Sequence, residues 1–414
     1  MVPNGWKEVK LGDVISHQKG FAFKSEHYCD EGKRIIRISD TDRNSIHDKS
    51  PVYINDDNSA GLERYALSTG DIILSTVGSR PHLLDSMVGK AVQIPPKDEG
   101  ALLNQNLVKI SPKKKLITNN YLFSMLKKNK FNFFISTLVR GNANQVSITL
   151  NELFSYKFLL PTYDEQQKIA KILSTWDKAI ATTEKLIDAS QQQKKALMQQ
   201  LLTGKKRLLD DSGKPFEGEW EEVRVANFGK VVTGNTPPKG DDSNYGSDIS
   251  WATAEDFKGK YVGNTKVKLT KSGVSKARLV PKGSVLVTCI ASIGKNAIAD
   301  EDLTTNQQIN AVIVSSKHCN EFFYYQIEFN KHKLLAWAGT TAVPILNKSS
   351  FEKILLLAPL KHEQQKIASV LTAADKEIEL LETKLAHLKN EKKALMQQLL
   401  TGKRRVKVEA MEMA

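Results

Sequence analysis

Residues 165–205 are EQQKIAKILSTWDKAIATTEKLIDASQQQKKALMQQLLTGK, with no proline anywhere and no glycine before Gly204. Gln, Lys, Ala and Leu, which favour helices, dominate this stretch. Its apolar residues recur at alternating spacings of three and four, the pattern of a coiled-coil seam. The stretch therefore predicts a helix of about 40 residues, roughly 60 Å long, whose single apolar stripe needs a partner.

The same stretch returns later in the chain. KKALMQQLLTGK occurs letter for letter at 194–205 and again at 392–403, 198 residues further on. Without a gap, 165–207 and 363–405 agree at more than half of their positions, and EQQKIA opens both copies. A period of this size is that of a domain, so the chain is interpreted as a duplicated two-part unit rather than a solenoid.

Both copies carry the seam, and the duplication favours an antiparallel pair formed by the two helices. Two helices that each pack on their own domain are the alternative. Lys194 and Lys392 interrupt the seam at equivalent positions, where a lysine can extend its charge to solvent, and no chemistry is assigned to them. The predicted seam consists of Ile169, Leu173, Trp176, Ile180, Ile187, Leu197 and Leu201 in the first helix and Ile367, Leu371, Ile378, Leu381, Leu385, Leu388, Leu395 and Leu399 in the second.

The segments between the helices differ from each other. Both contain short strand-like runs, such as DIILSTV (71–77) and SVLVTCI (284–290), with turn signals between them, and each has a helical stretch. Their fold class is mixed, α/β or α+β, and their strand order cannot be derived. The predicted organisation is a first variable domain at 1–160, a helix at 161–207, a linker at 208–219, a second variable domain at 220–358, a helix at 359–405 and a tail at 406–414.

Composition limits the function classes. The chain has 414 residues, 40% hydrophobic content and a net charge of +14, an excess that favours a polyanion such as nucleic acid as partner. The cysteines, Cys29, Cys289 and Cys319, are too few and too dispersed for a disulfide framework or zinc knuckle. No apolar run is long enough to span a bilayer, which predicts a soluble cytoplasmic protein.

No catalytic motif is evident. Asn235-Thr236-Pro237-Pro238 resembles the adenine methyltransferase motif only superficially, because a Thr interrupts it and no aromatic residue follows. A phosphate-binding loop, a zinc-binding HExxH motif and a GxSxG nucleophile elbow are all missing. The sequence therefore favours a non-catalytic DNA-recognition protein over an enzyme.

At this point the chain resembles a known family, the specificity (S) subunits of type I restriction–modification systems. LPTYDEQQKIAKIL (160–173) and APLKHEQQKIASVL (358–371) are similar to the starts of that family's two conserved helices, and ALMQQLLTGK to their ends. GFAFKSEHY (20–28) resembles an early element of its variable domains, and TGNTPPKGDDSNYGS (233–247) departs from that element. The resemblance extends over nearly the whole chain.

The resemblance implies a function. Each variable domain would be a target recognition domain for one half of a bipartite double-stranded DNA site, and the antiparallel helices would set the spacer. Two methyltransferase (M) subunits, which bind S-adenosylmethionine, would dock on the two repeated helix ends, and two restriction (R) subunits would add an ATP- and Mg-dependent endonuclease. This chain would bind no cofactor or metal and would methylate no DNA by itself.

Polar residues on loops are the candidates for contact with DNA, because Arg and Lys suit guanine and phosphate and Asn and Gln suit adenine. The candidate DNA contacts are Lys24, Ser79, Arg80, Arg140, Asn142, Asn144 and Gln145 in the first domain and Lys239, Lys295, Asn296 and Thr340 in the second. The candidate docking residues for the methyltransferase subunits are Leu197, Met198, Leu202, Leu395, Met396 and Leu400. Asn104-Gln105 and Asn306-Gln307 recur in both domains and are interpreted as structural.

Three other functions stay open on the sequence alone. A stand-alone DNA-binding or architectural protein would explain the charge but not two matching helix ends on unlike domains. A nuclease or methyltransferase with an unrecognised motif would act without a partner subunit. An interaction scaffold would bind without the steep salt dependence that phosphate contacts produce.

Overall fold

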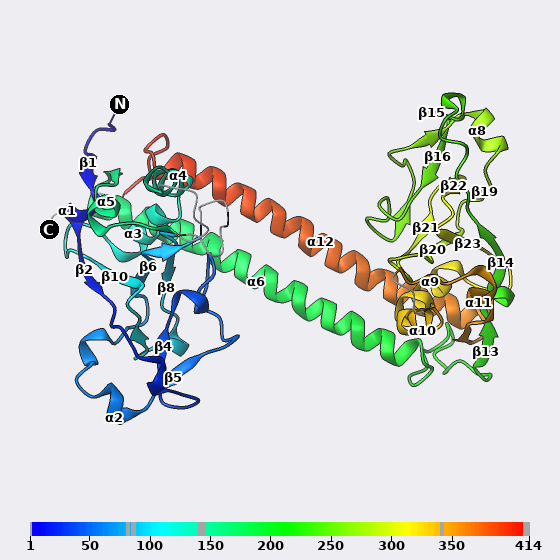
Figure 1. The fold of residues 1–414 in the computed structure, drawn as a ribbon, viewed down its shortest axis with the longest axis horizontal. Coiled ribbons are helices and arrows are strands. Elements are labelled where there is room, and N and C mark those ends of the chain that lie inside the picture. Colours follow the sequence, from blue (N-terminus) through cyan, green and yellow to red (C-terminus); the bar gives the residue numbers. More distant parts are fainter. Residues whose placement is uncertain (1, 80–82, 84–87, 140–145, 340–342, 409–414) are drawn as a thin grey trace. The chain divides into compact units, whose positions relative to one another are not determined.

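The computed structural model describes residues 2–79, 83, 88–139, 146–339 and 343–408, which form two compact units (Figure 1). The first unit comprises residues 1–183 together with 384–414, and the second comprises residues 184–383. Each unit therefore contains one part of each of the two long helices, α6 (Tyr163–Leu201) and α12 (Lys361–Leu399). The boundaries of the two units therefore differ from the boundaries of the two sequence repeats.

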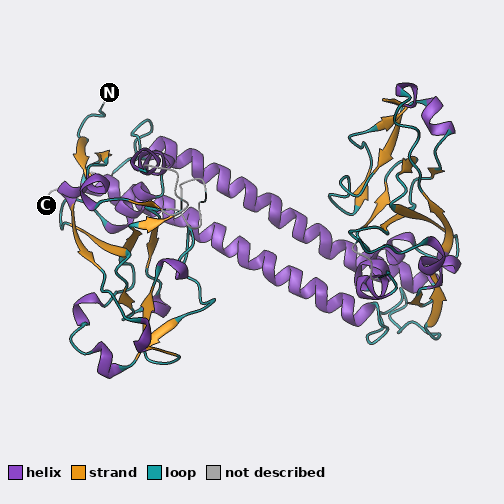
Figure 2. Cartoon of the chain, in the orientation of Figure 1, coloured by secondary structure: helices purple, strands orange, loops and turns teal. Residues whose placement is uncertain are grey.

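The two predicted long helices are present, and both are uninterrupted (Figure 2). Each has 39 residues and begins two residues after a proline, at Pro161 and Pro359. Beyond their ends, Gly204 and Gly402 have φ angles of +70° and +69°. A glycine with a positive φ angle turns the chain so that backbone amides beyond the helix can bond to its last free carbonyl groups. This is the helix end that the Thr-Gly signal predicts. Among the described residues, no helix is long and apolar enough to cross a membrane.

Within each unit the two helix segments run antiparallel. In the first unit, Asp177 of α6 pairs with Lys392 of α12, and in the second unit Lys194 of α6 pairs with Asp375 of α12. All fifteen predicted seam residues are buried or half-buried, whereas apolar side chains off the seam, such as Leu186 and Leu380, are exposed. The antiparallel pairing predicted from the sequence is confirmed, and the burial of these residues supports the predicted seam.

The first unit contains two four-stranded sheets. One has the order β2-β10-β6-β8, and the other has the order β3-β5-β4-β9, in which β4 and β9 are parallel. A further pair, β1 with β12, joins the start of the domain to the residues before α6. The strands are β1 (Lys7–Lys10), β2 (Ile15–Lys19), β3 (Tyr28–Cys29), β4 (Lys33–Ile36), β5 (Val52–Ile54), β6 (Ile72–Ser75), β7 (Val77–Gly78), β8 (Ala91–Gln93), β9 (Leu102–Leu103), β10 (Leu107–Pro112), β11 (Val146–Ser147) and β12 (Lys157–Leu160).

The second unit repeats these strand orders and adds one edge strand to each sheet. Its sheets have the orders β14-β23-β20-β21-β17 and β15-β18-β16-β22-β19, with β16 and β22 parallel, and β13 pairs with β24. Mixed sheets with few parallel pairs make both domains α+β. The strands are β13 (Glu221–Arg224), β14 (Gly229–Thr233), β15 (Tyr245–Gly246), β16 (Ile249–Ala252), β17 (Tyr261–Val262), β18 (Lys268–Leu269), β19 (Leu279–Val280), β20 (Val285–Thr288), β21 (Asn296–Ala299), β22 (Leu303–Thr305), β23 (Ile309–Val314) and β24 (Leu355–Ala358).

Short helices complete both domains. In the first unit, α3 and α4 follow β10 in the sequence and cover the sheet that contains it. In the second unit, α9 and α10 follow β23 and cover the equivalent sheet. Their bounds are α1 (Leu11–Val14), α2 (Asp56–Ser59), α3 (Asn119–Leu126), α4 (Asn129–Leu138) and α5 (Leu150–Phe154), then α7 (Val225–Phe228), α8 (Lys271–Ser275), α9 (Asn320–Phe329), α10 (Lys331–Ala336) and α11 (Lys348–Lys353).

The long helices belong to the domain cores. In the first unit, Ile169 and Leu173 of α6 and Leu399 of α12 pack in one buried cluster with the sheet and with α3 and α4. The equivalent cluster of the second unit contains Leu201 of α6 and Ile367 of α12. Each helix thus starts in the core of one domain and ends in the core of the other, so packing on a domain and pairing with the other helix occur together.

The recurring Asn-Gln pairs have a structural role in both domains. The backbone carbonyl of Asn104 lies 2.0 Å from where a Cβ on Gly20 would be, and that of Asn306 lies 2.3 Å from a Cβ on Gly234. Only glycine permits such close approach of two backbones. The GFAFKS and TGNTPPK elements therefore occupy equivalent places despite their different sequences.

Leu371 on α12 tests the contribution of the helices to the second core. Leu371 is fully buried, so Leu371→Ala should lower the free energy of unfolding by about 2–5 kcal/mol through lost packing and a residual cavity. Leu380→Ala on the same helix is the control, because Leu380 is 66% exposed and its truncation should change stability by less than about 0.5 kcal/mol. Urea denaturation measures both, and equal effects would contradict the assignment of the seam.

Candidate nucleic-acid interface and its helical support

Each unit contains a polar joint between the start of one long helix and the end of the other. In the first unit, the carboxylate of Glu165 accepts hydrogen bonds from the indole of Trp6 at 3.0 Å and from Nε of Arg405 at 2.7 Å. In the second unit, the carboxylate of Glu363 accepts from Nε of Arg207 at 2.6 Å and from Nη2 at 2.7 Å. Both glutamates are buried, and a buried carboxylate needs such partners.

These contacts cross between the two copies of the repeat. Glu165 and Glu363 are equivalent positions, and so are Arg207 and Arg405, with 198 residues between the members of each pair. The glutamate at the start of each copy binds the arginine that follows the end of the other. Each helix end must therefore fit the start of the opposite copy, which gives a physical reason for the ends to be alike.

The glutamines of EQQKIA fix each helix start to its domain. Oε1 of Gln166 accepts from the backbone of Thr118 at 2.8 Å, and its Nε2 donates to the carbonyl of Leu116 at 3.0 Å. Gln364 repeats this arrangement, with Oε1 accepting from the backbone of Cys319 at 3.0 Å and Nε2 donating to Pro359 at 2.8 Å. Both side chains are buried, so the Glu-Gln pair is a structural anchor.

The lysines inside the seam form crossed ion pairs. Nζ of Lys194 lies 2.7 Å from Asp375 and 3.4 Å from Glu328, and Lys392 pairs with Asp177. Burial alone lowers the pKa of Lys194, but the two carboxylates outweigh it and raise the pKa above its usual value. Lys194 therefore stays charged, and the two crossed ion pairs link α6 to α12 within each unit.

The repeated turns are the helix ends with the sequence KKALMQQLLTGK, residues 194–205 and 392–403. Each has apolar side chains buried in its own unit. Met198, Leu202 and Leu400 are at most 8% exposed, so as placed they are not available to a partner subunit. The carbonyl of Leu202 accepts from Gln326 at 2.9 Å, and that of Leu400 accepts from Nζ of Lys128 at 3.1 Å. Because these side chains are buried, a partner subunit would have to bind the exposed side of the same turns. The other candidates, Leu197, Leu395 and Met396, are half-buried against the two cores.

Two candidate DNA contacts of the first domain lie in described segments. The side chain of Lys24 is 73% exposed, and its amine lies 3.5 Å from Glu26. Ser79 is half-buried after β7, and its carbonyl accepts from the backbone of Val88 at 2.9 Å. The other candidates in this domain lie outside the described residues, namely Arg80, Arg140, Asn142, Asn144 and Gln145.

The candidates of the second domain are in different settings. Lys239 is exposed in the turn that follows β14. Nζ of Lys295 donates to the carbonyl of Ala254 at 2.7 Å, and Nδ2 of Asn296 on β21 donates to Tyr324 of α9 at 2.8 Å. These bonds commit part of the hydrogen-bonding capacity of both side chains within the protein. Thr340 lies outside the described residues.

A half-buried lysine that the sequence did not indicate, Lys260, joins the second domain to α12. Nζ of Lys260 lies 2.6 Å from the hydroxyl of Thr372 and 4.7 Å from the centre of the Tyr325 ring. The Tyr325 hydroxyl donates to Asp375 at 2.5 Å. Burial lowers the pKa of Lys260, and Glu321 opposes that shift at 3.4 Å. These contacts fix the second variable domain to α12.

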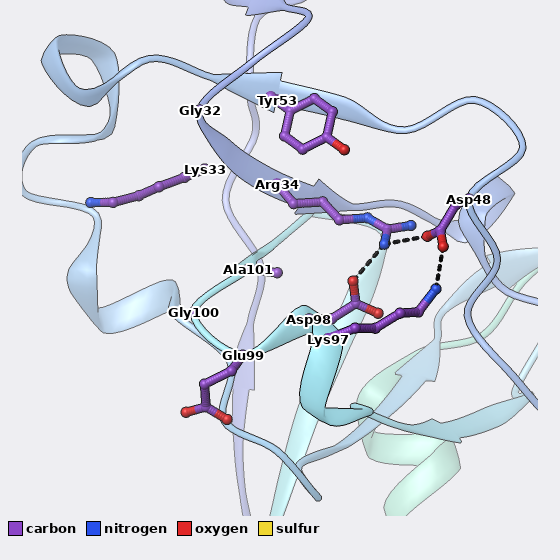
Figure 3. A pocket seen from close by; sticks show the side chains of 10 residues that line it. All are labelled: Gly32, Lys33, Arg34, Asp48, Tyr53, Lys97, Asp98, Glu99, Gly100 and Ala101. Atoms are coloured by element: carbon purple, nitrogen blue, oxygen red, sulfur yellow. Dashed lines mark hydrogen bonds and ion pairs between the residues drawn. The ribbon is translucent and has the colours of Figure 1, made fainter.

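A hollow of about 560 Å³ in the first domain is lined by charged side chains (Figure 3). Arg34 lies between Asp48 at 2.6 Å and Asp98 at 2.5 Å, and Lys97 also binds Asp48. The hydrogen bond from Lys97 and then that from Arg34 lower the pKa of Asp48. The two aspartates neutralise the chain's own cations, so the hollow is a structural ion-pair network. In the described part of the chain, no group of three His, Cys, Asp or Glu residues is placed to hold a metal ion.

The topology and the crossed joints define a duplicated α+β domain on paired helices, and comparison with known proteins identifies the family. The family model for the type I restriction modification DNA specificity domain matches residues 3–190 and 217–390. The chain therefore belongs to this family, and the resemblance inferred from its motifs is confirmed. The family assignment makes it a specificity subunit, not a catalytic one.

Named relatives agree with this assignment, and a solved structure shares the fold. The putative type I restriction enzyme MjaX specificity subunit of Methanocaldococcus jannaschii is 28% identical over 98% of this chain and 95% of its own length. The HindI specificity subunit of Haemophilus influenzae is 22% identical over 88% of this chain and 93% of its own. The crystal structure of the S subunit from M. genitalium shares the fold, with a TM-score of 0.61 at 12% identity, covering 96% of both chains.

Arg405 provides a test of the polar joint in the first unit. Burial raises the pKa of Glu165, but the hydrogen bonds from Arg405 and Thr162 outweigh it and lower the pKa below the ordinary value of 4.5. A lowered pKa stabilises the folded state above pH 4.5, and this contribution is lost as the pH falls through the folded pKa. Arg405→Ala should therefore destabilise the first unit at pH 7 and much less at pH 3.

Thermal unfolding at both pH values measures this difference. Arg404→Ala is the matched control, because Arg404 is an exposed neighbour outside the joint, and its effect should be small and independent of pH. A loss of stability in Arg405→Ala that is the same at pH 3 and pH 7 would show that the pair with Glu165 does not stabilise the joint.

Proposed function

We propose that this chain supplies DNA sequence recognition to a type I restriction–modification complex, with each variable domain recognising one half of a bipartite site. The observation that carries the proposal is the same α+β topology built twice on one shared pair of helices. Two domains of one fold and different sequence suit two half-sites of different sequence. The net charge of +14 suits the phosphate backbone between and beside them.

The helices are proposed to set the spacer between the half-sites. Each has 39 residues, which corresponds to about 58 Å at 1.5 Å per residue. Two recognition elements on one face of DNA must be about 34 Å apart, or a multiple of it, because the duplex repeats with that pitch. Paired helices of this length are long enough to serve as such a support.

The partners are proposed to be two methyltransferase subunits, with two restriction subunits in the complete enzyme. Their docking sites would be the exposed sides of the two repeated turns, around Lys195 and Gln199 in α6 and Lys393 and Gln397 in α12. S-adenosylmethionine, ATP and Mg²⁺ would bind those partners and not this chain, and the complex would act in a prokaryotic cytoplasm. The domain boundaries predicted at 160, 207, 219, 358 and 405 stay part of this proposal, as do the candidate DNA contacts.

Genome-wide mapping of methylated adenines tests the recognition function. The chain is co-expressed with its methyltransferase subunit in a host that lacks other adenine methylation. The expected result is a split motif with a fixed gap of unrecognised base pairs, and its loss when this chain is omitted. Methylation that persists at the same sites without this chain would overturn the proposal, because recognition would then belong to the partner.

Subunit stoichiometry tests the docking surfaces. Native mass spectrometry of the purified complex should show two methyltransferase subunits per chain. Lys195→Glu with Gln199→Glu should remove one of them, and the same changes at Lys393 and Gln397 should remove the other. Lys178→Glu is the control, since Lys178 is exposed on α6 outside the repeated turn. Two bound subunits in a variant altered at both turns would place docking elsewhere.

A further inference from the structure

One turn has the same two residues in both domains, although the loops around it differ. Asn104-Gln105 lies between β9 and β10, and Asn306-Gln307 lies between β22 and β23, so in each domain this turn connects one sheet to the other. Both asparagines are at most 9% exposed, whereas both glutamines are exposed. These two pairs are called the Asn-Gln turns.

The asparagine fixes the shape of each turn. Oδ1 of Asn104 accepts from the amide of Asn106 at 3.4 Å, and Oδ1 of Asn306 accepts from the amide of Gln308 at 3.1 Å. An asparagine that bonds to the backbone two residues further on closes a turn locally. The glutamine between the two bonded residues is thereby held in place, while its side chain stays at the surface.

In the first domain, the Asn-Gln turn is bonded to two segments that contain candidate DNA contacts. The amide of Gln105 donates to the carbonyl of Phe21 in the GFAFKS element at 2.8 Å. The amide of Thr76, which lies three residues before the candidate Ser79, donates to the carbonyl of Asn106 at 3.0 Å. The exposed glutamine therefore lies beside segments that the sequence analysis had selected on other grounds.

The second domain repeats these contacts. Oε1 of Gln307 accepts from the hydroxyl of Thr236 in the TGNTPPK element. The amide of Cys289, which follows β20 as Thr76 follows β6, donates to the carbonyl of Gln308 at 2.8 Å. A glutamine oxygen has two lone pairs, so Gln307 can accept a second hydrogen bond there.

A glutamine in such a place is suited to recognise adenine. Its amide oxygen accepts from the N6 amino group of adenine, and its NH₂ group donates to N7, a pair of atoms that adenine presents in the major groove. In the part of the chain that the structure describes, the side chain of Gln105 makes no hydrogen bond, so both of its groups are available to DNA.

The recurrence of the glutamine indicates a base that both half-sites share. The residues after the equivalent glycines differ, with FAFK at 21–24 in the first domain and NTPP at 235–238 in the second. Residues that differ suit the bases that differ between two half-sites. Under the proposed function, two copies of one adenine methyltransferase act on the two half-sites, so an adenine is the base that both must contain.

We propose that Gln105 and Gln307 each recognise an adenine through its N6 and N7 atoms, one in each half-site. Both glutamines are then specificity-determining residues, and the asparagine before each of them is a positioning residue. This inference rests on the proposed function and adds to it a base contact that the two domains have in common.

Binding of the complete methyltransferase complex to a duplex that carries the mapped motif tests the inference, in the absence of S-adenosylmethionine so that no base is methylated. Gln105→Ala should weaken binding roughly 5- to 150-fold, as the loss of a bidentate base contact does. The slope of affinity against salt should stay unchanged, because no phosphate contact is lost. The unfolding temperature should also stay unchanged, because the side chain is exposed. Gln192→Ala is the matched control, since Gln192 is exposed on α6 outside both domains.

A base analogue assigns the contact to single atoms. 7-Deazaadenine, which lacks the N7 acceptor, replaces each adenine of the motif in turn. With the unmodified chain, one such replacement in each half-site should weaken binding. Gln105→Ala should abolish the effect of the analogue in one half-site, and Gln307→Ala should abolish it in the other.

Each other outcome decides against the inference. Unchanged affinity in Gln105→Ala overturns it and leaves the proposed function intact. An equal loss of affinity for the motif and for scrambled DNA, or a lowered unfolding temperature, also overturns it, because the glutamine then contacts the DNA backbone or supports the fold. Fewer bound methyltransferase subunits in Gln105→Ala would make the turn a protein-docking surface. Failure of the unmodified complex to bind the motif refutes the proposed function itself, and the inference with it.

Discussion

A buried carboxylate at the start of each long helix is the constraint on which the rest of the structure depends. Glu165 and Glu363 cannot lose their hydration without a cationic partner, and in each case the partner is an arginine that follows the end of the other helix. This requirement ties the two copies of the repeat together at both joints. It leaves the segments between the joints free to differ.

The framework and the recognition surfaces consequently follow different rules. At the joints, one chemistry is used twice: Glu with Arg, Gln with backbone groups, and a seam lysine with an aspartate. In the domains, one topology holds two unlike sequences. Gly20 and Gly234 come from unlike loops but meet equivalent backbone carbonyls, those of Asn104 and Asn306. A family built in this way can change what it recognises without changing how it is assembled.

The helical part of the fold was predictable from the sequence because its signals are local. The three-and-four spacing gives the seam, Thr-Gly gives the helix ends, and the duplication favours the antiparallel pair. Periodicity shows which residues share a face of a helix. It does not show whether that face packs against the same chain or against a partner subunit. Met198, Leu202 and Leu400 were therefore assigned to an outside partner, whereas their own unit covers them.

The site was less predictable because its contacts join residues that are distant in the sequence. No spacing links Lys260 to Tyr325 and Asp375, so the brace between the second domain and α12 left no motif. Loop composition selected Lys295 and Asn296 as polar candidates, but it carries no information on the internal partners that the fold gives them.

The division of the chain also determines the order in which it can fold during synthesis. The second unit, residues 184–383, is contiguous and is complete once its last residue has left the ribosome. The first unit begins earlier but needs residues 384–414, which are made after the second unit and include Leu399 and Arg405. Domains generally fold as units when their chain becomes available. The domain that is translated first must therefore wait, with an incomplete core and with Glu165 unpaired to Arg405, until residues 384–414 have been made.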